Sequence, residues 1–205
     1  MTTSEPTIDW RARAAALECP RQAFVDGAWR RSRGGATFVA DNPATGQPLA
    51  TVDEWTAEAV DDAVSIANAR FEAGVWADFD PAERKSIMGR FAEGVRAHAE
   101  RLALLETLET GKPIGQTSTV DVPACAATLQ WYGETLDKLY DEMAPAGNDA
   151  LISIRREPVG TVAAIVPWNY PLIIAGWKIG PALAAGNSVI LKPAEESTLA
   201  SLLLG

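Results

Sequence analysis

Cysteine and histidine are scarce in this sequence, which has two cysteines, Cys19 and Cys125, and one histidine, His98. Two isolated cysteines are too few for a disulfide framework, and neither lies in a Cys-x-x-Cys or Cys/His metal pattern. We therefore expect no transition-metal site of the zinc type. A sequence without a disulfide pattern is typical of a reducing compartment, so we predict a cytoplasmic location.

Positive charge is also in deficit, with 18 Lys and Arg residues against 27 Asp and Glu residues and a net charge of −9. Nucleic acids and anionic membrane surfaces are bound through basic patches, so this balance argues against both as partners. The stretch Met1–Trp10 has no basic start followed by an apolar core, and we expect no secretion signal. The expected partner is a small molecule or another protein.

Long uninterrupted hydrophobic runs are absent. The segment Pro158–Trp177 has no charged residue and is long enough in principle to span a bilayer. Pro167, Asn169 and Pro171 interrupt it, and a helix with asparagine between two prolines leaves backbone groups unpaired in lipid. We therefore expect no membrane partner.

Short strands and turns are predicted near the amino terminus. The Asp-Gly pair inside Phe24–Trp29 is flanked by apolar residues and is a two-residue hairpin signal. A second pair of strands, Thr37–Val39 and Pro48–Val52, flanks Asn42–Gly46, which is rich in turn formers. These segments predict antiparallel structure at the edge of the molecule.

A helical region follows. Thr56 is placed to cap a first helix that ends before Gly74, and Asp80 with Pro81 begins a second one. We predict that the second helix runs without a break to Thr110, with an apolar face formed by Ile87, Phe91, Val95, Leu102 and Leu105. A third helix is predicted over residues 122–140, with core-packing side chains Trp131, Leu136 and Leu139.

The pattern then changes to strand, helix, strand. Leu151–Arg156 is a short predicted strand, and Thr161–Val166 is a continuous apolar run typical of a strand buried on both faces of a parallel sheet. Tyr170–Ala185 has the length of a helix, Ser188–Leu191 is another buried strand, and Glu196–Leu204 begins a further helix. This order predicts a right-handed βαβ unit and an α/β fold.

Polar side chains stand where the two buried strands end. Asn169 follows the first strand, and Lys192 and Glu195 follow the second, so neighbouring strands would place all three at one crevice. An asparagine amide can donate to a developing oxyanion, and a lysine with a glutamate can hold a ribose. Two plainer interpretations stay open: Asn169 closes a turn, and Lys192 and Glu195 form an exposed ion pair, which spacing alone favours. The sequence has no Gly-x-Gly-x-x-Gly fingerprint.

Several motifs together resemble the aldehyde dehydrogenase superfamily. Within that family the chain is most similar to γ-glutamyl-γ-aminobutyraldehyde and betaine-aldehyde dehydrogenases, through residues 131–134 and 155–160. The motifs that carry the wider resemblance cover nearly the whole chain and are Asn42–Gly46, Leu108–Pro113, Pro167–Pro171, Gly180–Asn187 and Lys192–Glu195.

The resemblance implies an incomplete cofactor-binding domain with an edge hairpin region, a helical layer and the start of a parallel sheet. Residues 1–140 would form the amino-terminal part of that domain, and residues 141–158 the intersubunit strand segment of a homo-oligomer. Residues 159–205 would begin the NAD(P)-binding core, and the catalytic domain is absent. The implied cofactor is NAD, because a carboxylate at Glu195 repels the 2′-phosphate of NADP. NADP is the alternative.

The resemblance also implies residue roles. Asn169 would hold the oxyanion formed when a cysteine thiolate attacks the aldehyde, and Lys192 and Glu195 would bind the adenosine ribose. Tyr170 and Trp177 would shape the aldehyde tunnel. The residues that would line the cofactor path are Ile165, Val166, Pro167 and Trp168.

The nucleophilic cysteine of the family has no counterpart here. Cys125 lies between two alanines on a predicted helix and is interpreted as a buried structural thiol. We therefore predict the amino-terminal part of an NAD(P)-dependent enzyme that oxidises an aldehyde, such as an amino- or γ-glutamylamino-aldehyde, to a carboxylic acid. The chain alone is expected to be inactive. The alternative is a non-catalytic remnant that binds cofactor or associates with full-length subunits.

Overall fold

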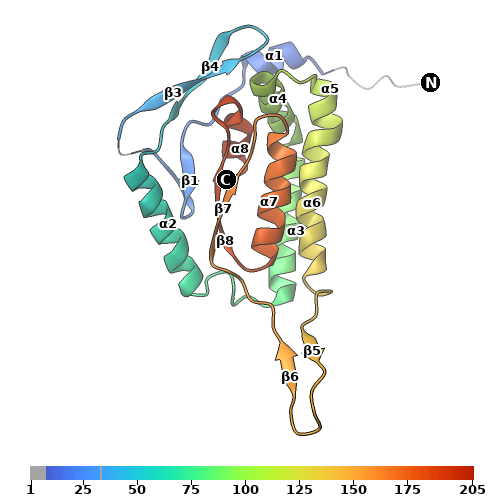
Figure 1. The fold of residues 1–205 in the computed structure, drawn as a ribbon. Coiled ribbons are helices and arrows are strands. Elements are labelled where there is room, and N and C mark those ends of the chain that lie inside the picture. Colours follow the sequence, from blue (N-terminus) through green and yellow to red (C-terminus); the bar gives the residue numbers. More distant parts are fainter. Residues whose placement is uncertain (1–7, 33) are drawn as a thin grey trace, which may run out of the picture.

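The computed structural model describes residues 8–32 and 34–205 and shows helices packed beside short sheets (Figure 1). A short helix, α1 (Trp10–Ala15), precedes the antiparallel pair β1 (Ala23–Val25) and β2 (Ala28–Arg30). Asp26 and Gly27 join these strands with φ values of 54° and 74°. Two successive left-handed residues are the signature of a type I′ turn, so the predicted hairpin is confirmed.

The second predicted hairpin is also confirmed. Strands β3 (Thr37–Asn42) and β4 (Gln47–Asp53) pair antiparallel, with a register shift after Ala40. In the turn, the Asn42 side chain accepts a hydrogen bond from the Ala44 amide over 2.9 Å, and Gly46 has a φ of 66°. The turn-forming residues therefore act through their own side chain and backbone freedom.

The predicted helix starts are confirmed. Helix α2 (Ala57–Glu72) begins after Thr56, whose hydroxyl accepts from the Ala59 amide, and α3 (Pro81–Ala97) begins after Asp80. The Asp80 carboxylate accepts from the amides of residues 82 and 83, which have no partner within the helix. Side-chain caps of this kind stabilise a helix by about 1 kcal/mol.

The prediction of one unbroken second helix is wrong. Helix α3 ends at Ala97, and α4 (Ala99–Thr110) begins after His98, whose φ and ψ of −103° and 16° interrupt the helical path. Residues 102–106 of α4 are all buried, which a helix with a single apolar face does not permit. The break carries no glycine or proline; it coincides with a contact of His98 Nδ1 with the Gly94 carbonyl oxygen over 2.9 Å and with the burial of α4.

The third predicted helix begins at Val122 as expected and ends earlier, at Thr135. Helix α5 (Ile114–Gln116) and a π-helical turn (Thr117–Asp121) lead into α6 (Val122–Thr135). The prediction that this helix extends to Tyr140 is wrong, because α6 ends at Thr135. Trp131 and Leu139 are 59% and 70% exposed and do not pack into the core, whereas Leu136 is partly buried.

The predicted strand at residues 151–156 is confirmed over its central part. Strands β5 (Glu142–Ala144) and β6 (Ile152–Ile154) form an antiparallel hairpin. Figure 1 shows this hairpin projecting away from the helices, beyond the end of α6.

The predicted βαβ unit is confirmed. Strands β7 (Thr161–Ile165) and β8 (Ser188–Lys192) pair in parallel and are joined by α7 (Pro171–Ala184). A 3₁₀ turn (Glu195–Ser197) and α8 (Leu199–Leu203) follow. The two strands contact α7 and also α2, where the Ser188 hydroxyl donates to the Ala67 carbonyl oxygen over 3.0 Å.

The expectation that the first parallel strand is buried on both faces is wrong. Ala164 and Val166 are buried at 3% and 2% exposure, whereas Ile165 between them is 72% exposed. Alternate residues of a strand point to opposite faces, so only one face of β7 is covered at this end.

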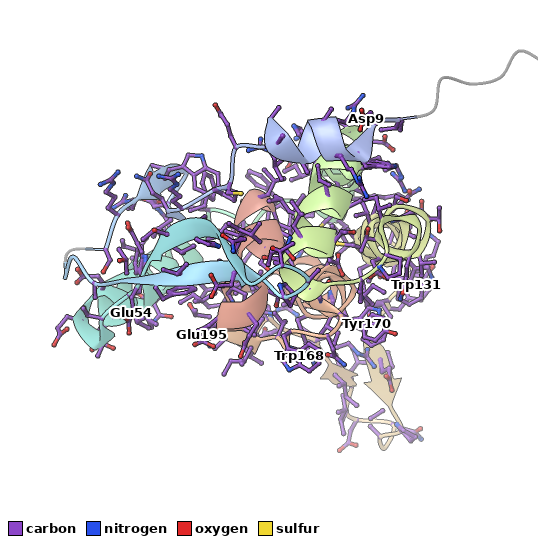
Figure 2. All side chains as sticks on the ribbon, turned by 90° about the horizontal axis from the view of Figure 1, so that it is seen from above. Asp9, Glu54, Trp131, Trp168, Tyr170 and Glu195 are labelled. Carbon is purple, nitrogen blue, oxygen red and sulfur yellow. The ribbon has the colours of Figure 1, made fainter. Side chains whose placement is uncertain are left out.

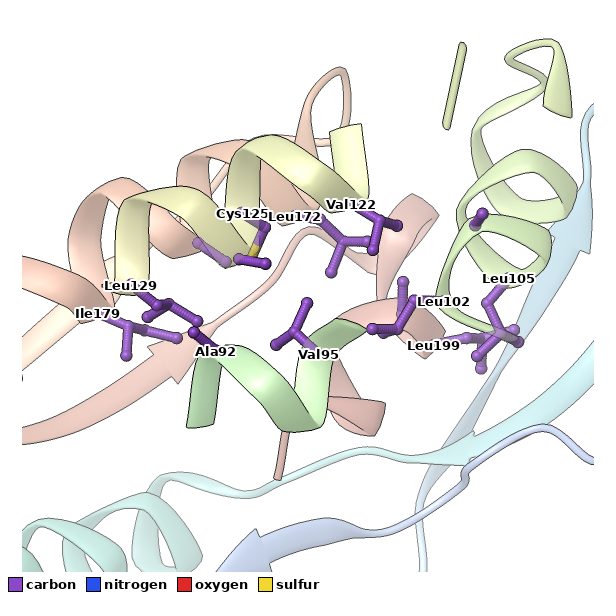
Figure 3. Packing of buried hydrophobic residues seen from close by; sticks show 14 of the residues in the cluster. Ala92, Val95, Leu102, Leu105, Val122, Cys125, Leu129, Leu172, Ile179 and Leu199 are labelled. Carbon is purple, nitrogen blue, oxygen red and sulfur yellow. The ribbon is translucent and has the colours of Figure 1, made fainter. Parts of the chain in front are cut away.

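The core lies where α3, α4, α6, α7 and α8 meet (Figure 3). Helices α6 and α7 approach closely at Gly176, which has no side chain. A Cβ at this position would lie only 3.3 Å from Cys125 Sγ. At the opposite end of the core, the buried Glu109 carboxylate of α4 accepts hydrogen bonds from the amides of Leu199 and Ala200 in α8. The arrangement confirms the predicted α/β fold with edge hairpins, a helical layer and the start of a parallel sheet.

Candidate functional site

The two parallel strands bring their carboxyl ends to one edge. Pairing runs from Thr161 opposite Ser188 to Ile165 opposite Lys192. Beyond the strands, the Val166 amide donates to the Lys192 carbonyl oxygen over 3.1 Å, so the two chains continue side by side. The segments that follow β7 and β8 therefore start together, at the edge where open α/β sheets place ligands. Figure 2 shows Glu195, Trp168 and Tyr170 along the same margin of the molecule.

Lys192 and Glu195 form an ion pair at this edge. The Nζ–Oε1 distance is 2.9 Å, and the side chains are 55% and 65% exposed. The hydrogen bond from Lys192 lowers the pKa of Glu195, which keeps the carboxylate ionised. The plainer interpretation, an exposed ion pair, thus describes the observed geometry. Such a pair contributes only about 0–1 kcal/mol to stability, and both side chains remain accessible to the hydroxyls of a ligand.

Asn169 lies in the exposed turn between β7 and α7. Its position in the bend fits the interpretation as a turn residue, and in the part of the chain that the structure describes its side-chain amide has no hydrogen-bond partner. A free amide donor beside a sheet edge is suited to an oxygen atom that gains negative charge.

The four residues predicted to line the cofactor path do not all face the edge. Ile165 is 72% exposed, Trp168 is 58% exposed and Pro167 is exposed as well. Val166 points into the core and contributes only its backbone here. Exposed apolar side chains next to an ion pair provide a surface on which a flat aromatic ring can lie while the pair binds the hydroxyl groups of an attached sugar.

Tyr170 and Trp177, both predicted to shape an aldehyde tunnel, face different surroundings. Trp177 is 57% exposed and lines a shallow hollow of about 380 Å³ between α6 and α7. The hollow is also lined by Ala127, Thr128, Trp131 and Tyr132. Tyr170 does not line it; its ring lies instead over the ammonium group of Lys112, with Nζ 3.7 Å from the ring centroid.

A buried charged group that sequence reasoning missed lies under Tyr170. Lys112 Nζ is 2.5 Å from Asp121 Oδ2 and 3.4 Å from Glu106 Oε1. Both carboxylates are fully buried, and the Lys112 side chain is 13% exposed. Burial and the neighbouring Asp121 raise the pKa of Glu106 to about 8. We call these residues with Tyr170 the Lys112 cluster.

A sequence signal for part of this cluster exists. Glu106 and Glu109 recur at the spacing of Leu102 and Leu105, so helical periodicity places both carboxylates on the buried side of α4. A carboxylate on an apolar face requires a partner. The sequence does not predict that partner, because it is the π-helical turn that brings Asp121 back towards α4.

Neither cysteine has the surroundings of a nucleophile. Cys125 is fully buried, and burial raises the pKa of its thiol to about 12. Burial also raises the pKa of Cys19. The interpretation of Cys125 as a buried structural thiol is confirmed. Among residues 8–32 and 34–205, no group of three or more His, Cys, Asp or Glu side chains could hold a metal ion.

Within those same described ranges, no helix has both the length and the apolar character needed to cross a membrane.

Comparison with known proteins gives consistent matches. The model of the aldehyde dehydrogenase family matches residues 29–205. Aminoacetaldehyde dehydrogenase of Pseudomonas aeruginosa is 47% identical over 194 residues, which are 95% of this chain and 39% of that protein. The NADP/NAD-dependent aldehyde dehydrogenase PuuC of Escherichia coli is 45% identical, with the same shares of the two chains.

Solved structures agree. The γ-glutamyl-γ-aminobutyraldehyde dehydrogenase of Burkholderia cenocepacia superposes with a TM-score of 0.94 at 49% identity, over 96% of this chain and 40% of that one. The P. syringae indole-3-acetaldehyde dehydrogenase in complex with NAD⁺ and IAA gives a TM-score of 0.94 at 47% identity and the same coverage. The chain thus spans about two fifths of the length of the proteins it matches.

Proposed function

The chain belongs to the aldehyde dehydrogenase family, and we propose that it forms the cofactor side of an active site that oxidises an aldehyde to a carboxylic acid. The observation that carries the proposal is the convergence of exposed polar groups at one sheet edge. Asn169 follows β7, and Lys192 and Glu195 follow β8, which pairs with β7 in parallel.

The residues at this edge fit a nicotinamide dinucleotide. The ionised Glu195 carboxylate can accept hydrogen bonds from ribose hydroxyls, and Lys192 can donate to them. The exposed faces of Ile165 and Trp168 lie beside this pair and can cover an apolar ring. NAD supplies the hydride acceptor when bound. We assign NAD rather than NADP as the preferred cofactor, because Glu195 would repel a 2′-phosphate.

We assign to the Asn169 side chain the role of stabilising the oxyanion. When a thiolate attacks an aldehyde, the carbonyl oxygen gains negative charge, and a preorganised amide N–H stabilises it without changing its own charge. The accessible, unpartnered amide of Asn169 is suited to this role.

The thiolate itself comes from neither cysteine of this chain. Cys125 is buried with its pKa raised to about 12, so the thiolate form is suppressed, and the pKa of Cys19 is also raised. We therefore propose that these 205 residues alone do not oxidise aldehydes. The substrate class that we propose is an amino- or γ-glutamylamino-aldehyde, which the names of two relatives support.

NAD titration of the purified chain tests the cofactor assignment. We expect weak binding, with a Kd on the order of 1 mM, because only one side of the site is present. Lys192→Ala and Glu195→Gln should each weaken binding about tenfold, since a hydrogen bond to a charged group contributes about 1.5 kcal/mol. Saturation-transfer NMR detects affinities of this size.

A matched control uses the exposed Glu93–Arg96 ion pair of α3, which has the same three-residue spacing as Lys192–Glu195. Glu93→Gln should leave NAD binding unchanged. NADP should bind more weakly than NAD to the original chain, and Glu195→Gln should narrow that difference. No detectable NAD binding at millimolar ligand would contradict the cofactor assignment and with it the alternative of a cofactor-binding remnant.

We propose further that the β5–β6 hairpin, within the predicted segment 141–158, mediates self-association. Its support is a concentration of exposed apolar side chains on and beside the hairpin, in an element that projects from the rest of the molecule (Figure 1). Exposed apolar patches of this kind mark interaction surfaces. These side chains are Leu139, Tyr140, Met143, Leu151, Ile152, Ile154 and Val159.

Sedimentation velocity tests the association. The chain, of 21.8 kDa, should sediment as an oligomer, and Ile152→Asp should shift it to the monomer because a charge would be buried at the interface. Val60→Asp, at an exposed apolar position on α2, is the matched control and should leave the distribution unchanged. A monomeric original chain at high micromolar concentration would exclude this role.

The cytoplasmic location and the division of residues 1–140 and 159–205 stay predictions.

A further inference from the structure

Lys112 makes contacts that a surface lysine does not make. Its ammonium group has three N–H donors. Asp121 Oδ2 lies 2.5 Å away, Glu106 Oε1 lies 3.4 Å away, and the centroid of the Tyr170 ring lies 3.7 Å away. The ammonium is therefore enclosed by two carboxyl groups and one aromatic face.

The carboxyl side of this arrangement is rigidly placed. Glu106 belongs to α4, and Asp121 ends the π-helical turn that leads into α6. Both side chains are fully buried. The hydroxyls of Thr107 and Thr117 lie 2.8 Å apart and join the same two elements beside the carboxyl groups. The position of the ammonium is thus set by two helical elements.

The aromatic ring that faces the Lys112 ammonium belongs to the exposed turn that also carries the candidate oxyanion donor. Tyr170 directly precedes α7 and follows Asn169. A cation over the face of a tyrosine ring is attracted by the ring electrons, and the attraction is stronger when the pair is shielded from water. Lys112 is 13% exposed, so its ammonium group is largely shielded from water.

From these contacts we propose that Lys112 is a positioning residue, which holds the face of the Tyr170 ring and thereby fixes the backbone of the neighbouring Asn169, from which the donor amide projects. The inference rests on the proposed function, because it concerns the geometry of the oxyanion donor assigned there. Lys112 touches neither substrate nor cofactor in this role; it acts through Tyr170. Catalysis needs such donors to be held in place before charge develops on the substrate.

NMR of the ¹⁵N- and ¹³C-labelled chain tests the inference. The ring current of Tyr170 should move the ε-methylene protons of Lys112 upfield from those of the other lysines. The backbone amide of Asn169 should have an order parameter of about 0.85, typical of rigid backbone. Tyr170→Leu removes the ring and leaves the buried ion pair intact. It should abolish the upfield shift and lower the Asn169 order parameter to below about 0.6.

Further variants separate positioning from a purely structural effect. Lys112→Met should loosen Asn169 as Tyr170→Leu does, and Lys112→Arg, which keeps a cation under the ring, should restore rigidity. Phe79→Leu, at an exposed aromatic side chain away from both proposed sites, is the matched control and should change neither signal. An unchanged Asn169 order parameter in Tyr170→Leu would overturn the inference, even if Lys112→Met unfolds the chain.

NAD binding measured on the same samples reports the proposed function separately, because it depends on Lys192 and Glu195. Retained NAD binding with a rigid Asn169 in Tyr170→Leu refutes the positioning role alone. Absent NAD binding with a loosened Asn169 refutes the cofactor assignment and leaves the coupling between Lys112 and Asn169 established.

Discussion

Replacing Glu109 with alanine is expected to lower the free energy of unfolding by about 2–4 kcal/mol, a large part of the roughly 5–15 kcal/mol typical of a domain. The Glu109 carboxylate accepts from the amides of Leu199 and Ala200 over 2.6 and 3.0 Å. Leu199 and Ala200 are themselves fully buried at the start of α8. Alanine would leave both amides without an acceptor and a cavity beside them. Chemical denaturation followed by circular dichroism measures the loss.

The raised pKa of Glu109 also leads to a prediction of how the free energy of unfolding depends on pH. Burial raises its pKa from an ordinary 4.5 to about 8, outweighing the two amide hydrogen bonds that lower it. Between about pH 4.5 and pH 8 the folded chain therefore binds more protons at this site than the unfolded chain. Stability should fall as pH rises through this window. Glu106, with a pKa also raised to about 8, adds to the fall.

Glu109→Gln is the informative companion. Its amide oxygen can still accept one hydrogen bond, so it should destabilise less than alanine, and it removes one titrating group. The decline in stability between pH 5 and pH 8 should become shallower but persist through Glu106. Glu100→Gln, at an exposed carboxylate of the same helix, should retain the original slope. An identical slope in Glu109→Gln would contradict the assignment of the pH dependence to Glu109.

Features with a local chemical cause were predictable from the sequence. Asp80 caps α3, the Asp26-Gly27 turn forms a hairpin, and the apolar runs at residues 161–166 and 188–191 pair as parallel strands. The strand ends then place Asn169, Lys192 and Glu195 at one edge, and spacing alone indicated this. The likeness to a known family added the roles of these residues.

Features set by distant contacts were not predictable. The break at His98 is marked by no glycine or proline; the His98 ring nitrogen Nδ1 lies 2.9 Å from the Gly94 carbonyl oxygen of the last turn of α3, and α4 beyond it is buried on several sides. The exposure of Ile165 depends on which elements cover β7. The Lys112 cluster requires the π-helical turn to bring Asp121 beside Glu106, and no pattern of residue types specifies that turn.

The largest effect on activity is expected at Asn169. A hybrid enzyme makes it measurable, with this chain replacing the matching segment of P. aeruginosa aminoacetaldehyde dehydrogenase, which is 47% identical over 194 residues. Asn169→Ala in the hybrid should lower kcat about 10²- to 10³-fold, the loss typical of one oxyanion donor. The KM for NAD should stay nearly unchanged, because Asn169 is not part of the Lys192–Glu195 pair. NADH formation followed by absorbance gives both constants.

Two controls define the result. Asn68→Ala removes an exposed asparagine amide from α2 and should leave kcat unchanged. The unfused chain should form no NADH above background with any aldehyde tested, because its buried Cys125 cannot supply a thiolate. A loss below about tenfold in Asn169→Ala, or less than about 1.4 kcal/mol of transition-state stabilisation, would remove Asn169 from the oxyanion role. A folded hybrid without activity, or aldehyde-dependent NADH formation by the unfused chain, would contradict the proposed division of the active site.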